Sequence, residues 1–141
     1  MSHGTGDPLV TLREVNRRAA FNRWCGFVVE SASAGQAQLG MDWRDDMGQY
    51  AGYLHAGIVG ALIDTACGFA AFTVVGEVLA SHATVNFLRP AQGRRFIARA
   101  VVVKPGRQQS FTRCELFSVG DGGEQLVATG ETLLITVPPK Q

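Results

Sequence analysis

The sequence predicts an α+β fold in which one antiparallel β-sheet wraps around a long central apolar helix, with a short helix at the N-terminus. Three features support this prediction. The run from His55 to about Thr73 is apolar on nearly all sides, which is typical of a helix buried over most of its surface. Residues 35–43 alternate strictly between apolar and polar side chains, as strands do. Four further strand-like runs, separated by turn sequences, follow the helix.

Length and composition exclude several classes of protein. The 141 residues fit one domain, 1–141, in which residues 1–6 are expected to be disordered, and a hydrophobic content of 46% is enough for a core. The 13 basic and 12 acidic residues are scattered and leave a net charge of +1, so no nucleic-acid partner is expected. Three widely separated cysteines predict reduced thiols in a cytoplasmic protein. A signal peptide and a run of about 18 uninterrupted apolar residues are both missing, so no membrane partner is expected.

The first elements can be placed in order along the chain. Asp7 and Pro8 are residue types that cap and begin a helix, and they predict a short amphipathic helix to Ala19. Residues 24–32 and 35–43 are predicted to be two adjacent antiparallel strands. One face of the second strand is expected to hold Ala37, Leu39, Met41 and Trp43.

The region from residue 44 onward surrounds the long helix. Residues 44–54 carry charges and glycines and are predicted to form a functional loop. The strand-like runs beyond the helix are 78–89, 94–104, 107–119 and 124–137. Turn sequences separate them, so a meander is the simplest expected order. The apolar helix is expected to pack on the concave face of the sheet.

Asp64 is the residue that a purely structural interpretation does not explain. Its neighbours in the helix are suited to burial, and a buried carboxylate without partners is costly. One hypothesis is a carboxylate in a partly dry pocket, poised as general base or nucleophile toward an acyl group. The alternative is that Asp64 lies on a solvent-facing strip of the helix or bonds a backbone group at a subunit contact.

The start of the helix offers hydrogen-bond donors. At His55-Ala56-Gly57 the backbone N–H groups have no intrahelical partner, so they can stabilise a developing oxyanion with help from the helix dipole. Gly57 could instead simply relieve crowding at a tight turn. Asp64 lies seven residues beyond Gly57, a rise of about 10 Å, which is too far for both to act on one carbonyl within one chain. If both take part, they are expected to come from two subunits related by a two-fold axis.

Basic residues gather near the strand ends and could meet the phosphates of a nucleotide-bearing thioester, or could only protect sheet edges from association. They are Arg89, Arg94, Arg95, Lys104 and Arg107. The histidines and carboxylates have no metal-ligand spacing, and no glycine-rich phosphate loop follows a strand, so neither a metal nor nucleotide-dependent chemistry is expected.

These residues resemble the hotdog-fold thioesterases, in particular the branch of the phenylacetic-acid-pathway thioesterase and the Arthrobacter-type 4-hydroxybenzoyl-coenzyme A thioesterase. The likeness extends from about Phe21 to Val137. Its most specific part is similar to the family's Asn/Gln, Gly, His-Gly-Gly and Leu-x-Asp/Glu series, here Gln49, Gly52, His55-Ala56-Gly57 and Leu62-Ile63-Asp64. Further similarities are the runs 84–91, 104–107 and 127–130.

The resemblance implies hydrolysis of an acyl-coenzyme A thioester at a site shared between two subunits, with no cofactor besides the coenzyme A of the substrate. Asp64 would be the nucleophile or the base for water, and the amide of Ala56 or Gly57 would polarise the thioester carbonyl from the facing subunit. His55 and Gln49 would position substrate or water. The residues toward the coenzyme A nucleotide would be Arg89, Pro90 and Arg107. The expected assembly is a homo-oligomer, at least a dimer, and a homotetramer as a dimer of dimers.

The chain also departs from the family pattern. His-Ala-Gly replaces the usual His-Gly-Gly, which adds a methyl group beside the expected donor. Many members carry a hydroxyl one helical turn after the carboxylate or at the start of the next strand, where this chain has Gly68 and Ala80 beside Ser81. Ser81 and His82 are included among the expected substrate-binding residues, although a histidine held within a strand is the simpler interpretation of His82.

Two alternative functions stay open at the level of sequence. The first is a catalytically inactive module that binds acyl-coenzyme A, because a fold does not dictate activity. The second is a hotdog dehydratase acting on enoyl or hydroxyacyl thioesters, although the histidine and carboxylate arrangement of that branch is not evident here.

Overall fold

The computed structural model describes residues 6–138, so the disorder expected for residues 1–6 concerns positions that lie, apart from Gly6, outside the described part. The helices are α1 (Pro8–Arg18), α2 (Ala20–Cys25), a short 3₁₀ turn η1 (Asp45–Met47) and α3 (Ala56–Val75). The strands are β1 (Val28–Ser33), β2 (Gln36–Asp42), β3 (Val78–Phe87), β4 (Arg95–Lys104), β5 (Gln109–Gly120) and β6 (Gly123–Thr136).

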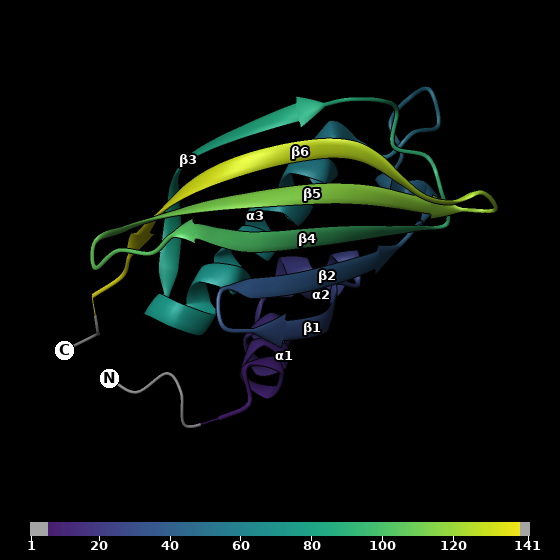
Figure 1. Cartoon of the computed structure of the whole chain (residues 1–141). Helices are drawn as coiled ribbons and strands as arrows, with labels where there is room; N and C mark the ends of the chain where they lie inside the picture. The colour runs from purple at the N-terminus through teal and green to yellow at the C-terminus, as the bar shows by residue number, and fades with distance from the viewer. Residues whose placement is uncertain (1–5, 139–141) are drawn as a thin grey trace.

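The six strands form one antiparallel sheet in the order β1-β2-β4-β5-β6-β3. The sheet curves around α3 (Figure 1), which confirms the predicted α+β architecture. The prediction that all four late strands form a meander is wrong, because β3 pairs with β6 and β4 pairs with β2. Residues 88–94 join β3 to β4 without a tight hairpin turn (Figure 1), so nothing local holds these two strands together.

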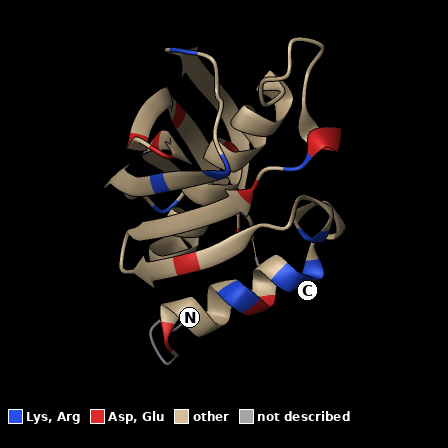
Figure 2. Ribbon diagram, turned by 90° about the vertical axis from the view of Figure 1, so that its right-hand side faces the viewer, with Lys and Arg blue, Asp and Glu red and all other residues tan. Residues whose placement is uncertain are grey.

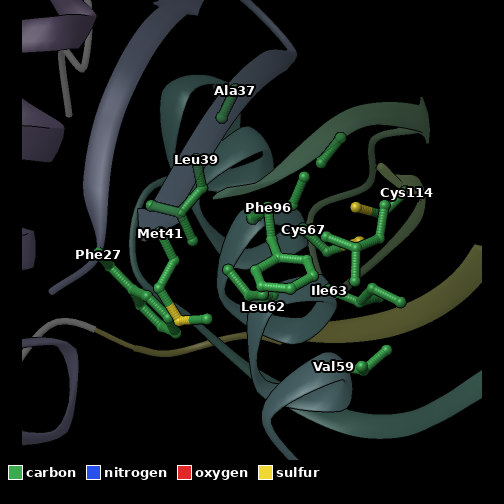
Figure 3. Close-up of a cluster of buried hydrophobic side chains, with 14 of the residues drawn as sticks. Phe27, Ala37, Leu39, Met41, Val59, Leu62, Ile63, Cys67, Phe96 and Cys114 are labelled. Atoms are coloured by element: carbon green, nitrogen blue, oxygen red, sulfur yellow. The ribbon is translucent and has the colours of Figure 1, made fainter. Parts of the chain in front are cut away.

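The core lies between α3 and the concave face of the sheet. Figure 3 shows Leu62 and Ile63 of α3 beside Phe96 of β4 and Met41 of β2. Gly130 of β6 has a specific part in this packing. A methyl group added there would come within 2.7 Å of Ile63 Cγ2, so the missing side chain allows β6 to approach α3 closely.

The helix α3 has the length and apolar composition of a membrane-crossing segment, with a mean hydropathy of 1.9. In this fold it is instead wrapped by the sheet (Figure 1). Its buried residues are Val59, Leu62, Ile63, Ala66, Cys67, Phe69, Ala70 and Ala71. Burial of this set in the protein core explains the hydropathy of α3 without a membrane.

The N-terminal region confirms one prediction and corrects another. Asp7 caps α1 as expected, since its carboxylate accepts a hydrogen bond from the Leu9 N–H at 3.0 Å. The predicted strand at 24–32 starts only at Val28, because α2 continues to Cys25 and is capped by Gly26, whose φ is 74°. Glycine adopts this left-handed conformation without a steric penalty.

The two edges of the sheet differ. At the β1 edge, the Arg13 side chain of α1 donates a hydrogen bond to the Val29 carbonyl at 3.1 Å. At the other edge, all ten residues of β3 are exposed or only half-buried in the single chain. The helix α1 carries three arginines and one glutamate, and acidic and basic residues are spread across the sheet (Figure 2), in keeping with the small net charge. Of the two edge strands, β3 with its ten residues is longer than β1 with its six, and among the described residues no strand pairs with its outer side.

Candidate active site

The start of α3 is capped by its own preceding histidine. His55 Nδ1 accepts the Gly57 N–H at 2.8 Å, and the His55 N–H bonds the Met47 carbonyl at 3.0 Å. Because His55 Nδ1 accepts a hydrogen bond, the ring proton lies on Nε2, and this N–H is available as a donor. Within residues 6–138, the Ala56 N–H has no hydrogen-bond partner. Of the two donors predicted from sequence, Gly57 is engaged and Ala56 is free.

The loop before α3 is fixed by Gln49. Its side-chain Oε1 accepts the N–H groups of Ala51 and, at 3.2 Å, Tyr53, while its backbone N–H bonds the Tyr53 carbonyl at 2.8 Å. Gly52 completes the turn with a φ of 87°. Because Oε1 is committed to the loop backbone, the side-chain amide NH₂ is the part of Gln49 that can reach a ligand.

A first cavity, of about 520 Å³, opens beside the start of α3. Its walls include Tyr53, Val59 and Phe87 together with predicted site residues. The predicted residues that it brings together are Gln49, His55, Ala56, Arg89 and Pro90. Arg89 and Pro90 were both expected near the coenzyme A nucleotide. They line the same cavity as the free Ala56 N–H at the start of α3.

A second cavity, of about 500 Å³, contains Asp64. Its walls are mostly apolar and come from α1, α3, β3 and β6, namely Val15, Ala19, Phe69, Phe72, Leu79 and Leu134. Among the described residues, the Asp64 carboxylate forms no ion pair and no side-chain hydrogen bond. In the single chain the Asp64 side chain is exposed, as the alternative of a solvent-facing strip expected, yet partial desolvation by its surroundings raises its pKa above the ordinary value.

Three of the predicted substrate-binding residues line neither cavity. Arg107 lies in the β4–β5 turn, and Figure 1 shows this turn at the opposite end of the sheet from the β3–β4 connection, the segment to which Arg89 belongs. Ser81 and His82 are exposed on β3 and line neither cavity. Ser81 sits at a bulge and donates to the Leu133 carbonyl at 3.3 Å. In a single chain these three residues therefore lie outside both cavities.

The contribution of the α1 region to the wall of the Asp64 cavity was not predicted from the sequence. Val15 and Ala19 line the cavity of Asp64 although they lie more than forty residues away in sequence. The amphipathic period of α1 indicated only that one face would be buried. Which partner covers that face is a long-range property, and no local motif signals it.

The cysteines offer no site of their own. Cys25, Cys67 and Cys114 are buried free thiols, which agrees with the prediction of reduced cysteines. Cys67 and Cys114 lie next to each other between α3 and β5 (Figure 3), and the hydrogen bond that the Cys114 thiol donates to Cys67, together with burial, raises the pKa of Cys114. In the described part of the chain, no group of three His, Cys, Asp or Glu side chains is arranged to hold a metal ion.

A curved antiparallel sheet around one long central helix is the hotdog arrangement, and the chain belongs to the thioesterase superfamily. Residues 51–124 match the model of that superfamily. A solved thioesterase family protein from Silicibacter pomeroyi is 34% identical and superposes with a TM-score of 0.90, covering 94% of this chain and 99% of its own. This likeness confirms both the predicted fold and the predicted family.

Two further comparisons extend this result. The PaaI protein of the E. coli phenylacetic acid degradation operon is 23% identical, with a TM-score of 0.80, and covers 94% of this chain and 98% of its own; it shows the shared fold. YigI of Salmonella typhimurium, a medium/long-chain acyl-CoA thioesterase, is 29% identical over 117 residues, which are 68% of this chain and 74% of YigI. The family and this relative support thioester hydrolysis as the general activity.

Proposed function

We propose that this protein hydrolyses an acyl-coenzyme A thioester to the free acid and coenzyme A at a site built from two subunits. One observation carries the proposal. The start of α3 offers a free N–H at Ala56, and two turns further on Asp64 offers an unpaired carboxylate of raised pKa. A donor for an oxyanion and a base for water are the two groups that thioester hydrolysis needs.

The separation of these groups argues for two subunits. Ala56 and Asp64 are eight residues apart on one straight helix, a rise of about 12 Å. Hydrogen bonding to a carbonyl and attack on its carbon both require about 3 Å. In our proposal, two antiparallel copies of α3 bring Ala56 of one subunit to Asp64 of the other, which creates two equivalent sites.

Two features of the single chain suit this arrangement. Gly60 lies midway between Ala56 and Asp64, where a two-fold axis would pass, and a methyl group built there meets nothing within 4 Å. Because Gly60 has no side chain, another helix can approach closely at this position. The exposed strand β3 lies at the sheet edge, where pairing with its own copy would continue the sheet.

The proposed chemistry balances with water as the only co-substrate. The Asp64 carboxylate takes a proton from water, and the oxygen of that water adds to the thioester carbonyl carbon. The Ala56 N–H of the facing subunit donates to the oxyanion that forms. The C–S bond then breaks, the acid is released, and the proton passes from Asp64 to the leaving thiolate. If Asp64 attacks directly, an acyl anhydride forms first and water cleaves it in a second step.

The remaining predicted residues are assigned to substrate binding. In our proposal the cavity at the helix start takes the coenzyme A arm, with Arg89 toward its phosphates and the amide of Gln49 and Nε2 of His55 as donors. Arg107 would reach the same coenzyme A from the facing subunit, because a two-fold axis reverses the ends of the sheet. Ser81 and His82 would approach from the shared β3 edge. The pairing of dimers into a tetramer and the cytoplasmic location stay predictions from sequence.

The proposal is tested by following free thiol release from a panel of aryl- and aliphatic-acyl-coenzyme A substrates. We expect the native protein to turn over some of them, and Asp64→Ala and Asp64→Asn to lose at least about a hundredfold in kcat while staying folded and associated. Undiminished turnover by both variants would contradict the role of Asp64. Binding of every substrate without turnover by the native protein would instead support the inactive binding module.

A further inference from the structure

Three residues form the wall between the cavity of Asp64 and a neighbouring hollow. Phe72 of α3 and Val15 and Arg18 of α1 line both spaces. The neighbouring hollow has a volume of about 530 Å³ and runs along α1. Phe72 is partly buried and packs against the core, so its ring is held in place between the two spaces.

An open path leads from the carboxylate to this wall. Gly68 follows Asp64 by one helical turn, and Phe72 follows by one more. At Gly68 an added methyl group would meet nothing within 4 Å, so no side chain blocks the surface of α3 between the two residues. Apolar side chains flank the path, among them Leu79 and Leu134. A flexible aliphatic chain could lie along it and lose its contact with water.

We propose that Phe72, supported by Val15 and Arg18, sets the upper limit on the length of the acyl group. This inference rests on the proposed function and adds to it a specificity-determining residue. The ring lies eight residues beyond Asp64, about 12 Å along the axis, of which van der Waals contact with the ring takes about 4 Å. An extended carbon chain rises about 1.25 Å per carbon, given bonds near 1.5 Å and angles near 111°. The remaining ~8 Å spans about six such steps, so the space fits an acyl group of roughly seven carbons, and octanoyl lies at its limit.

This limit on chain length should be visible in the dependence of kcat/KM on the number of acyl carbons. Each methylene that leaves water for an apolar wall contributes about 0.8 kcal/mol, which is about fourfold in binding or in kcat/KM. We expect kcat/KM of the native protein to rise with chain length up to about octanoyl-coenzyme A and then to stop rising or fall. The fall begins where the chain end meets the ring of Phe72.

The test compares butanoyl-, octanoyl-, dodecanoyl- and hexadecanoyl-coenzyme A in the thiol-release assay. In Phe72→Ala the wall opens into the hollow along α1, so the ratio of dodecanoyl to octanoyl kcat/KM should rise at least about tenfold. Phe72→Leu should give an intermediate ratio and serves in its place if the alanine variant does not fold. The matched control is Phe111→Ala, an exposed phenylalanine of β5 that lines neither space. The same length profile in native protein and both Phe72 variants would overturn the inference.

A binding experiment separates this inference from the proposed hydrolysis. The same four coenzyme A thioesters are titrated calorimetrically into Asp64→Asn, with and without Phe72→Ala. A shift of the preferred length by Phe72→Ala supports the wall even if the native protein hydrolyses nothing. An unshifted binding profile rejects the wall even if thiol release depends on Asp64.

Discussion

His55 and Ala56 divide two tasks at the start of α3. His55 satisfies the Gly57 N–H through Nδ1, which leaves the Ala56 N–H free at the positive end of the helix. From sequence, Ala56 and Gly57 were equivalent candidates, because both follow His55 and both are small. The difference depends on the rotamer of His55, and a motif does not encode a rotamer.

Replacing Ala56 by proline should remove the free donor and little else. Ala56 is the first helical residue, a position where proline is favoured, and His55 already has the extended conformation that precedes proline, with φ −60° and ψ 137°. We expect Ala56→Pro to lower kcat by about 10²–10³. Ala56→Gly keeps the N–H and should stay near the native rate. Equal loss in both variants, measured by thiol release, would mean that the methyl group matters and the N–H does not.

The raised pKa of Asp64 predicts that its charge destabilises the fold. An acid whose pKa is higher in the folded than in the unfolded chain binds protons more tightly when folded, so stability falls as pH rises from about 4 through the folded pKa. Asp64→Asn should therefore melt at a higher temperature than the native protein at pH 7 and show no such gain below about pH 4. Glu115→Gln, on the exposed face of β5, is the control. A lower melting temperature for Asp64→Asn at pH 7 would contradict this account.

The same pKa has a consequence for catalysis. If Asp64 acts as base, only its ionised form is active, so kcat/KM should fall as the pH approaches the raised pKa from above. A pH profile of thiol release checks this. An acid limb at the ordinary pKa of an aspartate, about 3.9, would show that the desolvation of Asp64 does not persist in the working enzyme.

At the scale of elements, the strand predicted from residue 24 was wrong at the junction between α2 and β1. The run from Trp24 to Ala32 has the composition of a strand, yet the chain stays helical to Cys25. Two buried asparagines hold this junction, as Asn16 donates to the Phe27 carbonyl at 2.8 Å and Asn22 donates to Asn16 at 3.0 Å. Such contacts bridge positions far outside a strand-length window, so local composition did not reveal them.

Asn16 should therefore contribute more to the stability of the fold than the exposed residues of the short helix α1. Asn16→Ala leaves the Phe27 carbonyl and the Asn22 amide without their partner, and we expect a loss of about 1–3 kcal/mol in the free energy of unfolding. Urea denaturation measures it. The control Glu14→Ala, on the same helix, removes only an exposed ion pair with Arg17 and should cost less than about 0.5 kcal/mol. Similar costs for the two variants would mean that the buried asparagine contacts add no stability.

At the scale of the whole molecule, locally encoded features were predictable and long-range ones were not. The alternation of residues 35–43 and the apolar run of α3 correctly predicted β2 and the central helix. The position of β3 at the sheet edge and the closure of the Asp64 cavity by α1 depend on packing between distant segments. Gln49, His55 and Ala56 share one cavity because they are close in sequence, whereas Arg107 does not join them within one chain.

The proposed assembly makes Gly60 a sensitive position. In the single chain a Cβ atom added at Gly60 meets nothing within 4 Å, and a better helix former than glycine should raise helix stability by up to about 1 kcal/mol. If two copies of α3 meet at Gly60, Gly60→Leu should instead shift the protein toward a folded monomer with little thiol release. Sedimentation velocity distinguishes the outcomes. An unchanged oligomer with full activity would exclude close helix contact at this position.

Mixing two inactive variants tests the shared site most directly. Asp64→Asn and Ala56→Pro subunits are each inactive in our account, and they are combined in equal amounts under conditions in which subunit exchange is verified by mass. Half of the random dimers carry one variant of each kind, and in these one of the two sites unites an intact Asp64 with an intact Ala56. The account predicts recovery of about a quarter of the native kcat. No recovery after complete exchange would contradict a site that takes its carboxylate from one subunit and its oxyanion donor from the other.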